Sequence, residues 1–274
     1  MKAPKFELEQ SPSLGDALKA IAAGAGMARA LAGGQSLVPM LNLRLAPVDS
    51  LVDLSRVAEL KKVEDKGDSI VYGAMLRHAD FEDGRVPDCA NGLLQHAAGK
   101  IAYRAVRNRG TMGGALCLAD PAADWLTVCA ALDARIHLAS SNGTRVLSIE
   151  EFAIGPYMTA LAEDELLVAI ELPKLSTDSR WGYYKVMRKT GEYADAFSIA
   201  IADGQRVRVV AGATDGAPIV LEQTAQAVAA GQAGADLAAV VEQELAAAGR
   251  EFNVAKSLLH KTAVLRAIDD LRKK

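Results

Sequence analysis

The sequence has few cysteines, and their spacing excludes several kinds of site. The 274 residues include three cysteines, Cys89, Cys117 and Cys129, and no two of them form a CxxC pair. They cannot supply a four-thiolate zinc or iron–sulfur centre. A sparse, odd-numbered set is typical of a reducing compartment, where buried thiols behave as small apolar groups. We therefore expect all three to pack in the core.

Signals of export, membrane insertion and nucleic-acid binding are also missing. The N-terminal stretch MKAPKFELEQSPSL lacks the apolar segment of a signal peptide, and no apolar run is long enough to cross a bilayer. A cytoplasmic location without a membrane span is therefore expected. The net charge is -3, and no basic stripe is interleaved with aromatic residues, so nucleic acid is not an expected partner.

The common catalytic and nucleotide-binding motifs are absent as well. No GxxxxGK[ST] occurs, and the GAGMAR run at 24–29 ends in arginine and follows a predicted helix, where a dinucleotide fingerprint needs a preceding strand. The histidines His78, His96, His137 and His260 are scattered, with neither a triad nor HExxH around them. Surface or satisfied core roles are expected for them.

What remains is an ordinary globular composition, half apolar and 24% charged, in a chain long enough for one large or two modest domains. Turn residues at Lys66-Gly67-Asp68 and Asp203-Gly204 predict hairpins, and Ser13 is a candidate helix N-cap. Proline 121 is expected in the first turn of a helix over 121–132. Strands are predicted at 5–9, 28–31, 51–54, 135–139, 166–172, 183–188, 197–203 and 206–211, and helices from about 220 onward. The pattern is α+β, with a boundary near 173–179.

Two glycine clusters carry the main chemical signal. Ala32-Gly33-Gly34-Gln35-Ser36-Leu37 lies between a predicted strand and a predicted helix, and Thr111-Met112-Gly113-Gly114-Ala115 is taken as a second such junction. Glycine lets a ligand approach the backbone, and successive N–H groups in a turn can bind an anion such as a diphosphate. Asp124 and the arginines at 104, 107 and 109 lie close in sequence to the second cluster. A glycine pair can also be a simple turn, and an arginine run a solvated face.

Two longer segments make the pattern specific. AGGQSLVPMLNLRLA (32–46) and VRNRGTMGGALCLADPAADW (106–125) resemble the flavin-binding signatures of the FAD-binding medium subunits of the carbon monoxide dehydrogenase and xanthine dehydrogenase group. The similarity also covers LVDLSRVAELKKV, YGAMLRHAD, ELLVAIELP and YYKVMRKTGEYADA, in order along nearly the whole chain. It implies a p-cresol methylhydroxylase-type FAD domain at 1–175, in subdomains of about 1–56 and 57–175. A small C-terminal α+β domain, an antiparallel sheet with helices, would cover 176–274.

The resemblance also implies which residues meet the cofactor. Asp124 would bind a flavin-side hydroxyl, Lys185 would lie close to the isoalloxazine, and Tyr193 would cover one face of it. Leu167 would offer a backbone contact near the ring. Without the resemblance, Tyr193 would read as a half-buried aromatic of the C-terminal sheet. The full set of implied FAD-binding residues is Ala32, Gly33, Gly34, Gln35, Ser36, Leu37, Ile101, Ala102, Thr111, Gly113, Gly114, Asp124, Leu167, Lys185 and Tyr193.

Some positions depart from the family pattern. Gln35 stands where some members have histidine, which excludes covalent flavin attachment there. Ala115 replaces an expected asparagine or serine, and Ile101 stands where some members place an aromatic against the ring. The cysteine-rich insertion of the hydroxybenzoyl-CoA reductase branch is missing, so membership of that branch is not expected. On this basis Gly34→Val is predicted to remove FAD, and Asp124→Ala only to weaken its binding.

The resemblance predicts a flavoprotein oxidoreductase subunit without a catalytic residue or metal of its own. Electrons would pass from the [2Fe–2S] clusters of a small subunit through FAD to an external acceptor, while a large subunit would carry molybdopterin. Such partners would form a heterotrimer or its dimer. Two alternatives are a self-sufficient FAD-dependent oxidase or reductase of the same fold, and a non-enzymatic nucleotide-binding assembly protein. The first would need an acid or base facing the flavin, and the second would bind adenine nucleotide without flavin.

Overall fold

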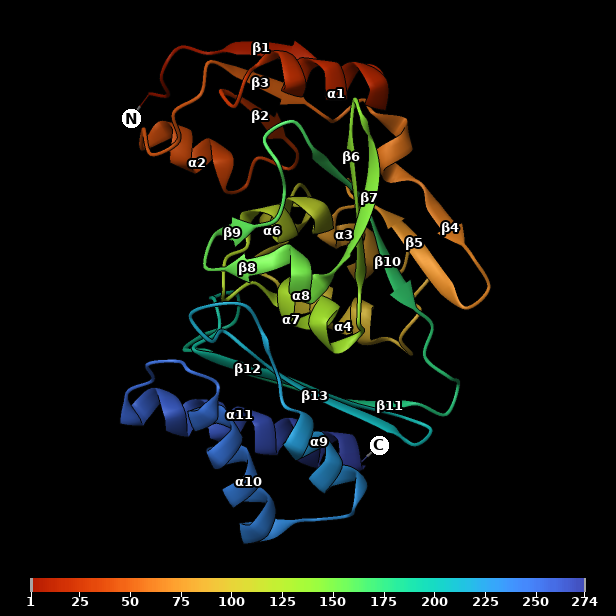
Figure 1. Cartoon of the computed structure of the whole chain (residues 1–274), viewed down its shortest axis with the longest axis vertical. Helices are drawn as coiled ribbons and strands as arrows, with labels where there is room; N and C mark the ends of the chain where they lie inside the picture. The colour runs from red at the N-terminus through yellow and green to blue at the C-terminus, as the bar shows by residue number, and fades with distance from the viewer. Residues whose placement is uncertain (1, 274) are drawn as a thin grey trace.

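The computed structural model describes residues 2–273, which form β-sheets with helices packed against them (Figure 1). At the N-terminal end, β1 (Glu7–Gln10), β3 (Ser50–Asp53) and β2 (Ala28–Leu31) form a parallel sheet in that order. Helices α1 (Leu14–Ala23) and α2 (Leu37–Asn42) connect these strands. The predicted N-cap is confirmed, because the Ser13 hydroxyl accepts a hydrogen bond from the N–H of Asp16 at 3.2 Å.

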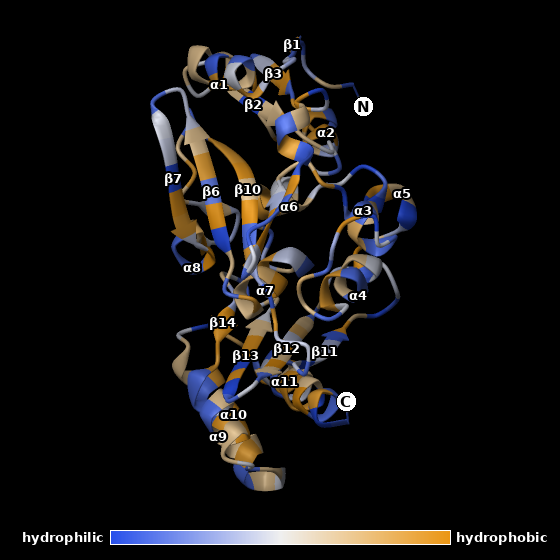
Figure 2. Ribbon diagram, turned by 90° about the vertical axis from the view of Figure 1, so that its right-hand side faces the viewer, coloured by the Kyte–Doolittle hydropathy of each residue, from blue (hydrophilic) through white to orange (hydrophobic). Residues whose placement is uncertain are grey.

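A second sheet forms the middle of the molecule. Its order is β4-β5-β10-β6-β7, and every neighbouring pair is antiparallel. The strand bounds are β4 Val63–Asp65, β5 Ser69–Gly73, β6 Arg135–Ser140, β7 Gly143–Ser148 and β10 Leu166–Pro173. Strand β10 is mostly apolar, as Figure 2 shows, and Glu171 is its one charged residue. This composition fits a central strand, in which Ile170 and Leu172 are fully buried.

Short helices cover this middle sheet and carry most of the candidate residues. They enclose the largest core cluster, in which Tyr72, Phe81 and Trp125 are among the large, fully buried side chains. A small hairpin of β8 (Ala153–Gly155) and β9 (Met158–Thr159) projects from the same region. The helices are η1 Ala58–Lys61, α3 His78–Glu82, α4 Leu93–Lys100, α5 Arg104–Arg107, α6 Met112–Leu118, α7 Asp124–Ala131 and α8 Ile149–Phe152.

The C-terminal part is an antiparallel sheet with helices. Strands β11 (Arg180–Val186), β12 (Ala196–Asp203), β13 (Arg206–Gly212) and β14 (Ile219–Val220) pair in chain order. Helix α11 (Val254–Lys273) packs against β11 and β12, and α7 of the middle region contacts β12 and β13. Helices α9 (Glu222–Ala229) and α10 (Gly234–Ala247) lie beside α11 at the lower end of Figure 1.

Two local expectations are wrong. Helix α7 begins at Asp124 rather than at Pro121, because Asp120 turns the chain first: its side chain accepts from the N–H of Ala122 and its carbonyl from that of Ala123. The second glycine cluster is not a strand-to-helix junction. It follows helix α5, and Gly113 and Gly114 lie in the first turn of α6.

Candidate functional site

The first glycine cluster forms a loop between β2 and α2 with unused main-chain donors. Gly34 has a φ of +70°, which favours glycine. Within residues 2–273, the five N–H groups of residues 33–37 have no hydrogen-bond acceptor. Backbone donors are nearly always paired in a folded protein, by protein groups, water or ligand. A run of five free donors in one turn has the geometry that can bind an anion.

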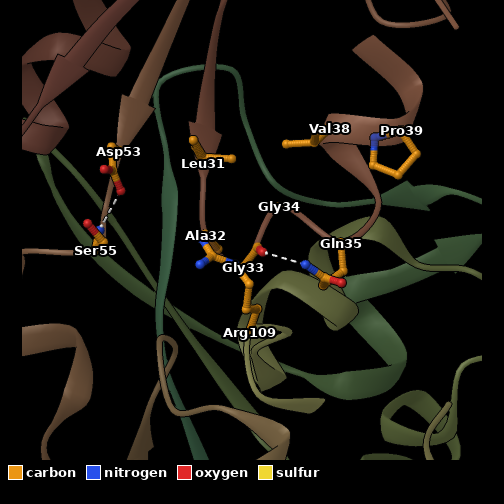
Figure 3. Close-up of a pocket in the computed structure, with 10 residues that line it drawn as sticks. All are labelled: Leu31, Ala32, Gly33, Gly34, Gln35, Val38, Pro39, Asp53, Ser55 and Arg109. Carbon is orange, nitrogen blue, oxygen red and sulfur yellow. Dashed lines mark hydrogen bonds between the residues drawn. The ribbon is translucent and has the colours of Figure 1, made fainter. Parts of the chain in front are cut away.

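These donors border a cavity of about 460 Å³. Figure 3 shows the loop on one side, with Arg109 beneath Gly33 and with Asp53 hydrogen-bonded to the Ser55 backbone. Arg109 forms no ion pair with any carboxylate of the described residues, so its charge is available to a bound anion. The lining residues are Leu31, Ala32, Gly33, Gly34, Gln35, Val38, Pro39, Asp53, Ser55 and Arg109.

The two glycine clusters lie against each other, although 76 residues separate Gly33 from Arg109. A Cβ on Gly33 would lie 2.2 Å from the carbonyl oxygen of Arg109 and 2.7 Å from Cα of Gly110. A Cβ on Gly114 would lie 3.4 Å from the Cβ of Ala32. Gly33 is therefore required by the close approach of two chain segments, whereas the sequence alone suggested the approach of a ligand.

The second cluster contributes packing rather than free donors. The N–H of Gly113 donates to the carbonyl of Ala74 at 3.0 Å, and the N–H of Gly114 donates to Oγ1 of Thr111 at 3.1 Å. A Cβ on Gly113 would lie 2.6 Å from that of Ala74. The unpaired main-chain donors thus come from the first cluster, and Gly113 and Gly114 let α6 pack beside it.

Of the three arginines at 104, 107 and 109, the first two already form ion pairs with carboxylates of this chain. Arg104 pairs with Glu82 and Asp83 at 2.6 Å, and Arg107 pairs with Glu82 at 2.7 Å. Arg107 also donates to the carbonyls at positions 101 and 102, at 2.8 and 2.9 Å. It therefore fixes the Ile101–Ala102 turn, whose carbonyl oxygens are not free. Only the third arginine of the run, at position 109, faces the cavity without a carboxylate partner among residues 2–273.

Asp124 and Lys185, both implied to meet the flavin, form a buried ion pair at 2.9 Å, with side chains 4% and 2% exposed. The hydroxyl of Tyr183 donates to the same carboxylate at 3.0 Å. Burial raises the pKa of Asp124, and the ammonium of Lys185 and the hydroxyl of Tyr183 oppose that shift. Since Asp124 begins α7 and Lys185 lies in β11, the pair also joins the middle region to the C-terminal sheet.

The other two implied ring contacts lie in different surroundings. Leu167 is buried in β10, where the pairing with β6 shifts between Leu167 and Ala169. The displaced carbonyl of Val168 accepts from the N–H of Ala74 at 3.0 Å. Tyr193 lies in the β11–β12 loop and is 59% exposed. Partial burial of its hydroxyl and the nearby carboxylate of Asp120 raise the pKa of Tyr193 to about 12.

From the sequence, His78 was expected to have only a surface or satisfied core role. The structure confirms a buried, hydrogen-bonded position and adds that His78 holds the segment before α6 in place. Its N–H donates to the carbonyl of Gly110 at 2.9 Å, and its Nδ1 accepts from Nε1 of Trp125 at 2.9 Å. The donor fixes the neutral tautomer with hydrogen on Nε2. No motif in the segment YGAMLRH indicated these partners, because Gly110 and Trp125 lie far from His78 along the chain.

Protonation of His78 is expected to destabilise the fold at acid pH. Burial, and then the charge of Arg107, lower the pKa of His78 from 6.5 to about 4. The unfolded chain binds the proton first, so this contribution is complete above pH 6.5 and is lost as the pH falls toward 4, at most about 3 kcal/mol. In urea unfolding across this range, His78→Gln should have a smaller loss of stability on acidification than wild type. His137→Gln, at a half-buried site, is the control, and equal pH profiles for wild type and His78→Gln would contradict the assignment.

The fold and the site together are those expected of a protein that binds an anionic ligand such as a dinucleotide, because five unpaired main-chain donors border a cavity with Arg109 beside them. Comparison with known proteins identifies the family. Residues 4–175 match the model of the FAD binding domain in molybdopterin dehydrogenase, and the chain belongs to that family. FAD as the cofactor of this chain, the oxidoreductase class and the α+β fold, all expected from the sequence, are confirmed.

Similar proteins and structures agree with this assignment. The chain is 37% identical to the carbon monoxide dehydrogenase medium chain of Hydrogenophaga pseudoflava over 70% of this chain and 67% of that one. It is 39% identical to the glyceraldehyde dehydrogenase medium chain of Sulfolobus acidocaldarius over 74% and 71%. A structure of carbon monoxide dehydrogenase from H. pseudoflava, lacking the Mo-pyranopterin moiety, matches with a TM-score of 0.92 at 29% identity, over 100% of this chain and 99% of that chain. Quinoline 2-oxidoreductase from Pseudomonas putida 86 matches with a TM-score of 0.87 at 30% identity, over the same shares.

Proposed function

We propose that this chain holds the FAD of a molybdenum hydroxylase and relays electrons from [2Fe–2S] clusters of a partner subunit to an external acceptor. The observation that carries the proposal is the run of five free N–H groups above the cavity, with Arg109 beside them, in a chain of this family. A diphosphate has the charge and the acceptor oxygens that this arrangement needs. FAD, when bound, supplies the redox chemistry.

The chain's own residues bind and orient the cofactor. In the proposed assignment the loop from Ala32 to Leu37 binds the diphosphate, while Thr111, Gly113 and Gly114 hold the neighbouring segment in place. Asp124 and Lys185 provide a fixed pair of charges near the flavin end. Leu167, Tyr193 and the Ile101–Ala102 turn would line the ring. No residue of this chain needs to exchange a proton with the organic substrate.

We also propose the division into domains. The parallel sheet within residues 7–53 supports a first subdomain of about 1–56, and the five-stranded sheet within 63–173 supports a second of about 57–175. The sheet that begins at residue 180 supports a C-terminal domain of 176–274. The cavity lies where the loop after β2 meets the segment before α6, that is, between the first two units.

The relatives named as medium chains and subunits imply an assembly with partner subunits. We propose an iron–sulfur small subunit and a molybdopterin large subunit, in a heterotrimer or its dimer, located in the cytoplasm. Within residues 2–273, no helix is long and apolar enough to span a membrane.

Co-purification with the partner subunits tests the proposal. The complex isolated from cells that co-express the three chains is expected to show the visible spectrum of a flavin at one FAD per copy of this chain. Acid extraction and fluorescence of the released flavin measure the stoichiometry. A complex that carries iron–sulfur clusters but no flavin would contradict the proposed function.

A further inference from the structure

A second hollow, of about 600 Å³, lies on the surface away from the diphosphate cavity. Three segments line it: the β8–β9 hairpin with the nearby Asp120–Ala122 turn, the loops that flank β12 and β13, and the start of α11. These segments lie together on the left side of Figure 1. The two cavities share no lining residue.

The rim of this hollow concentrates the exposed apolar side chains of the molecule. Nine large apolar side chains among residues 2–273 are more than half exposed. Six of them lie in the segments that line the hollow or directly beside these segments. Single exposed apolar residues are ordinary on a protein surface, but a cluster around one hollow marks an interaction site. The six are Ile154, Tyr157, Met158, Tyr193, Val254 and Leu258.

The lining carries an excess of negative charge. It contains Asp120, Asp195 and Asp215, against one cation, Lys256. Lys256 is paired with Asp215, and Asp120 accepts a hydrogen bond from the hydroxyl of Tyr157 at 3.2 Å. Asp195 is exposed and forms no ion pair with any of residues 2–273. The hollow therefore disfavours phosphates and other anions and favours a cationic group.

We propose that this acidic hollow and its apolar rim are the docking surface of the iron–sulfur subunit, which inserts a lysine or arginine flanked by apolar side chains. The charge of the hollow selects the basic residue, and the rim has the aromatic and methionine content of interface cores. The choice of the iron–sulfur subunit rests on the proposed function. Tyr193, assigned to the flavin ring, lies on the rim beside the lining residues Ala194 and Asp195. An electron donor docked here would face the flavin end of the chain.

The test uses the co-expressed complex, captured through a tag on the iron–sulfur subunit at two salt concentrations. Met158→Glu buries a charge in the apolar rim and is expected to weaken capture of this chain about tenfold or more. Val254→Glu, at the most exposed rim position, should act in the same direction. Asp195→Lys places a like charge opposite the inserted cation and should weaken capture and flatten its salt dependence.

Leu45→Glu is the matched control, because Leu45 is equally exposed but lies in the N-terminal unit, away from the hollow. It should bind the iron–sulfur subunit as wild type does, and all variants should keep the wild-type melting temperature. Capture of the rim variants at wild-type strength would overturn the docking surface. A second result would also overturn it. If the rim variants kept the iron–sulfur subunit but lost self-association of this chain in light scattering, the occupant of the hollow would be a second copy of the chain. The FAD content of the wild-type complex distinguishes the two kinds of failure. A wild-type complex with FAD leaves the proposed function intact even if the docking surface is wrong, whereas a complex without FAD contradicts the proposed function itself.

Discussion

Replacement of Gly33 by alanine is expected to weaken FAD binding about 100-fold or more while the chain still folds. The new methyl group would lie 2.2 Å from the carbonyl oxygen of Arg109, and backbone cannot move aside as a flexible side chain can. The loop must shift, which costs about 1–3 kcal/mol of stability. The five donors then lose their alignment with the diphosphate. Loss of two charge-assisted hydrogen bonds corresponds to about 100-fold weaker binding or more.

Flavin content of the complex and thermal unfolding of the Gly33→Ala variant measure the two effects. Gly15→Ala is the control, because Gly15 lies in α1 with only the Ser13 hydroxyl, at 3.9 Å, near its missing Cβ. That change should raise stability by up to about 1 kcal/mol and leave FAD in place. Gly34→Ala should be milder than Gly33→Ala, since its Cβ would meet only Val38 and Leu31 side chains, although its φ is positive. Wild-type flavin content in Gly33→Ala would contradict the assigned contact.

Replacement of Asp124 by alanine is expected to reduce the free energy of unfolding by about 3–5 kcal/mol, because it leaves the buried ammonium of Lys185 without a counter-charge. The sequence suggested only weaker FAD binding. The structure adds a stability effect, since this pair lies between α7 and β11. Urea unfolding measures the loss. Asp124→Ala combined with Lys185→Met should recover much of it, because no unpaired charge remains.

An exposed ion pair provides the control for this measurement. Asp65 pairs with Lys174 at 2.6 Å, but the Asp65 side chain is 61% exposed. Asp65→Ala should therefore have little effect on stability, because water and salt screen an exposed pair. Tyr183→Phe removes one hydroxyl donor from the Asp124 carboxylate, and its loss should lie between those of the other two variants, at about 1.5–2 kcal/mol. Similar losses of unfolding free energy for Asp124→Ala and Asp65→Ala would show that burial of the Asp124–Lys185 pair does not make it more important for stability.

Local sequence signals predicted a helix cap and two hairpin turns correctly, but they missed most of the short helices of the middle region. Ser13 caps α1 as expected, the turn at Lys66-Gly67-Asp68 joins β4 to β5, and Asp203-Gly204 joins β12 to β13. Each of these features depends on residues within a few positions of one another, so propensity and turn chemistry are sufficient. The helix start at Asp124 was misplaced because the Asp120 side chain forms a turn that competes with the first helical turn.

The candidate site was predictable in part. The loop from Ala32 to Leu37 could be identified because glycines in that context signal an anion-binding turn, and the structure leaves its donors free. The occupied N–H groups of Gly113 and Gly114 could not be foreseen, since their acceptors lie elsewhere in the fold, one of them on Ala74. For the same reason the sequence could not distinguish the arginines at 104, 107 and 109 from one another. The carboxylates that pair with the first two lie elsewhere in the chain, and only Arg109 lines the cavity.

By itself, the sequence determined several main strands and turns, the family and the cofactor, because these depend on local patterning and on motifs contiguous in the chain. Only the tertiary structure decided that Gly33 meets Arg109, that Asp124 pairs with Lys185, and that apolar side chains from 154 to 258 gather around one acidic hollow. These contacts join residues far apart in sequence. Their energies come from burial and close packing, which no local pattern specifies.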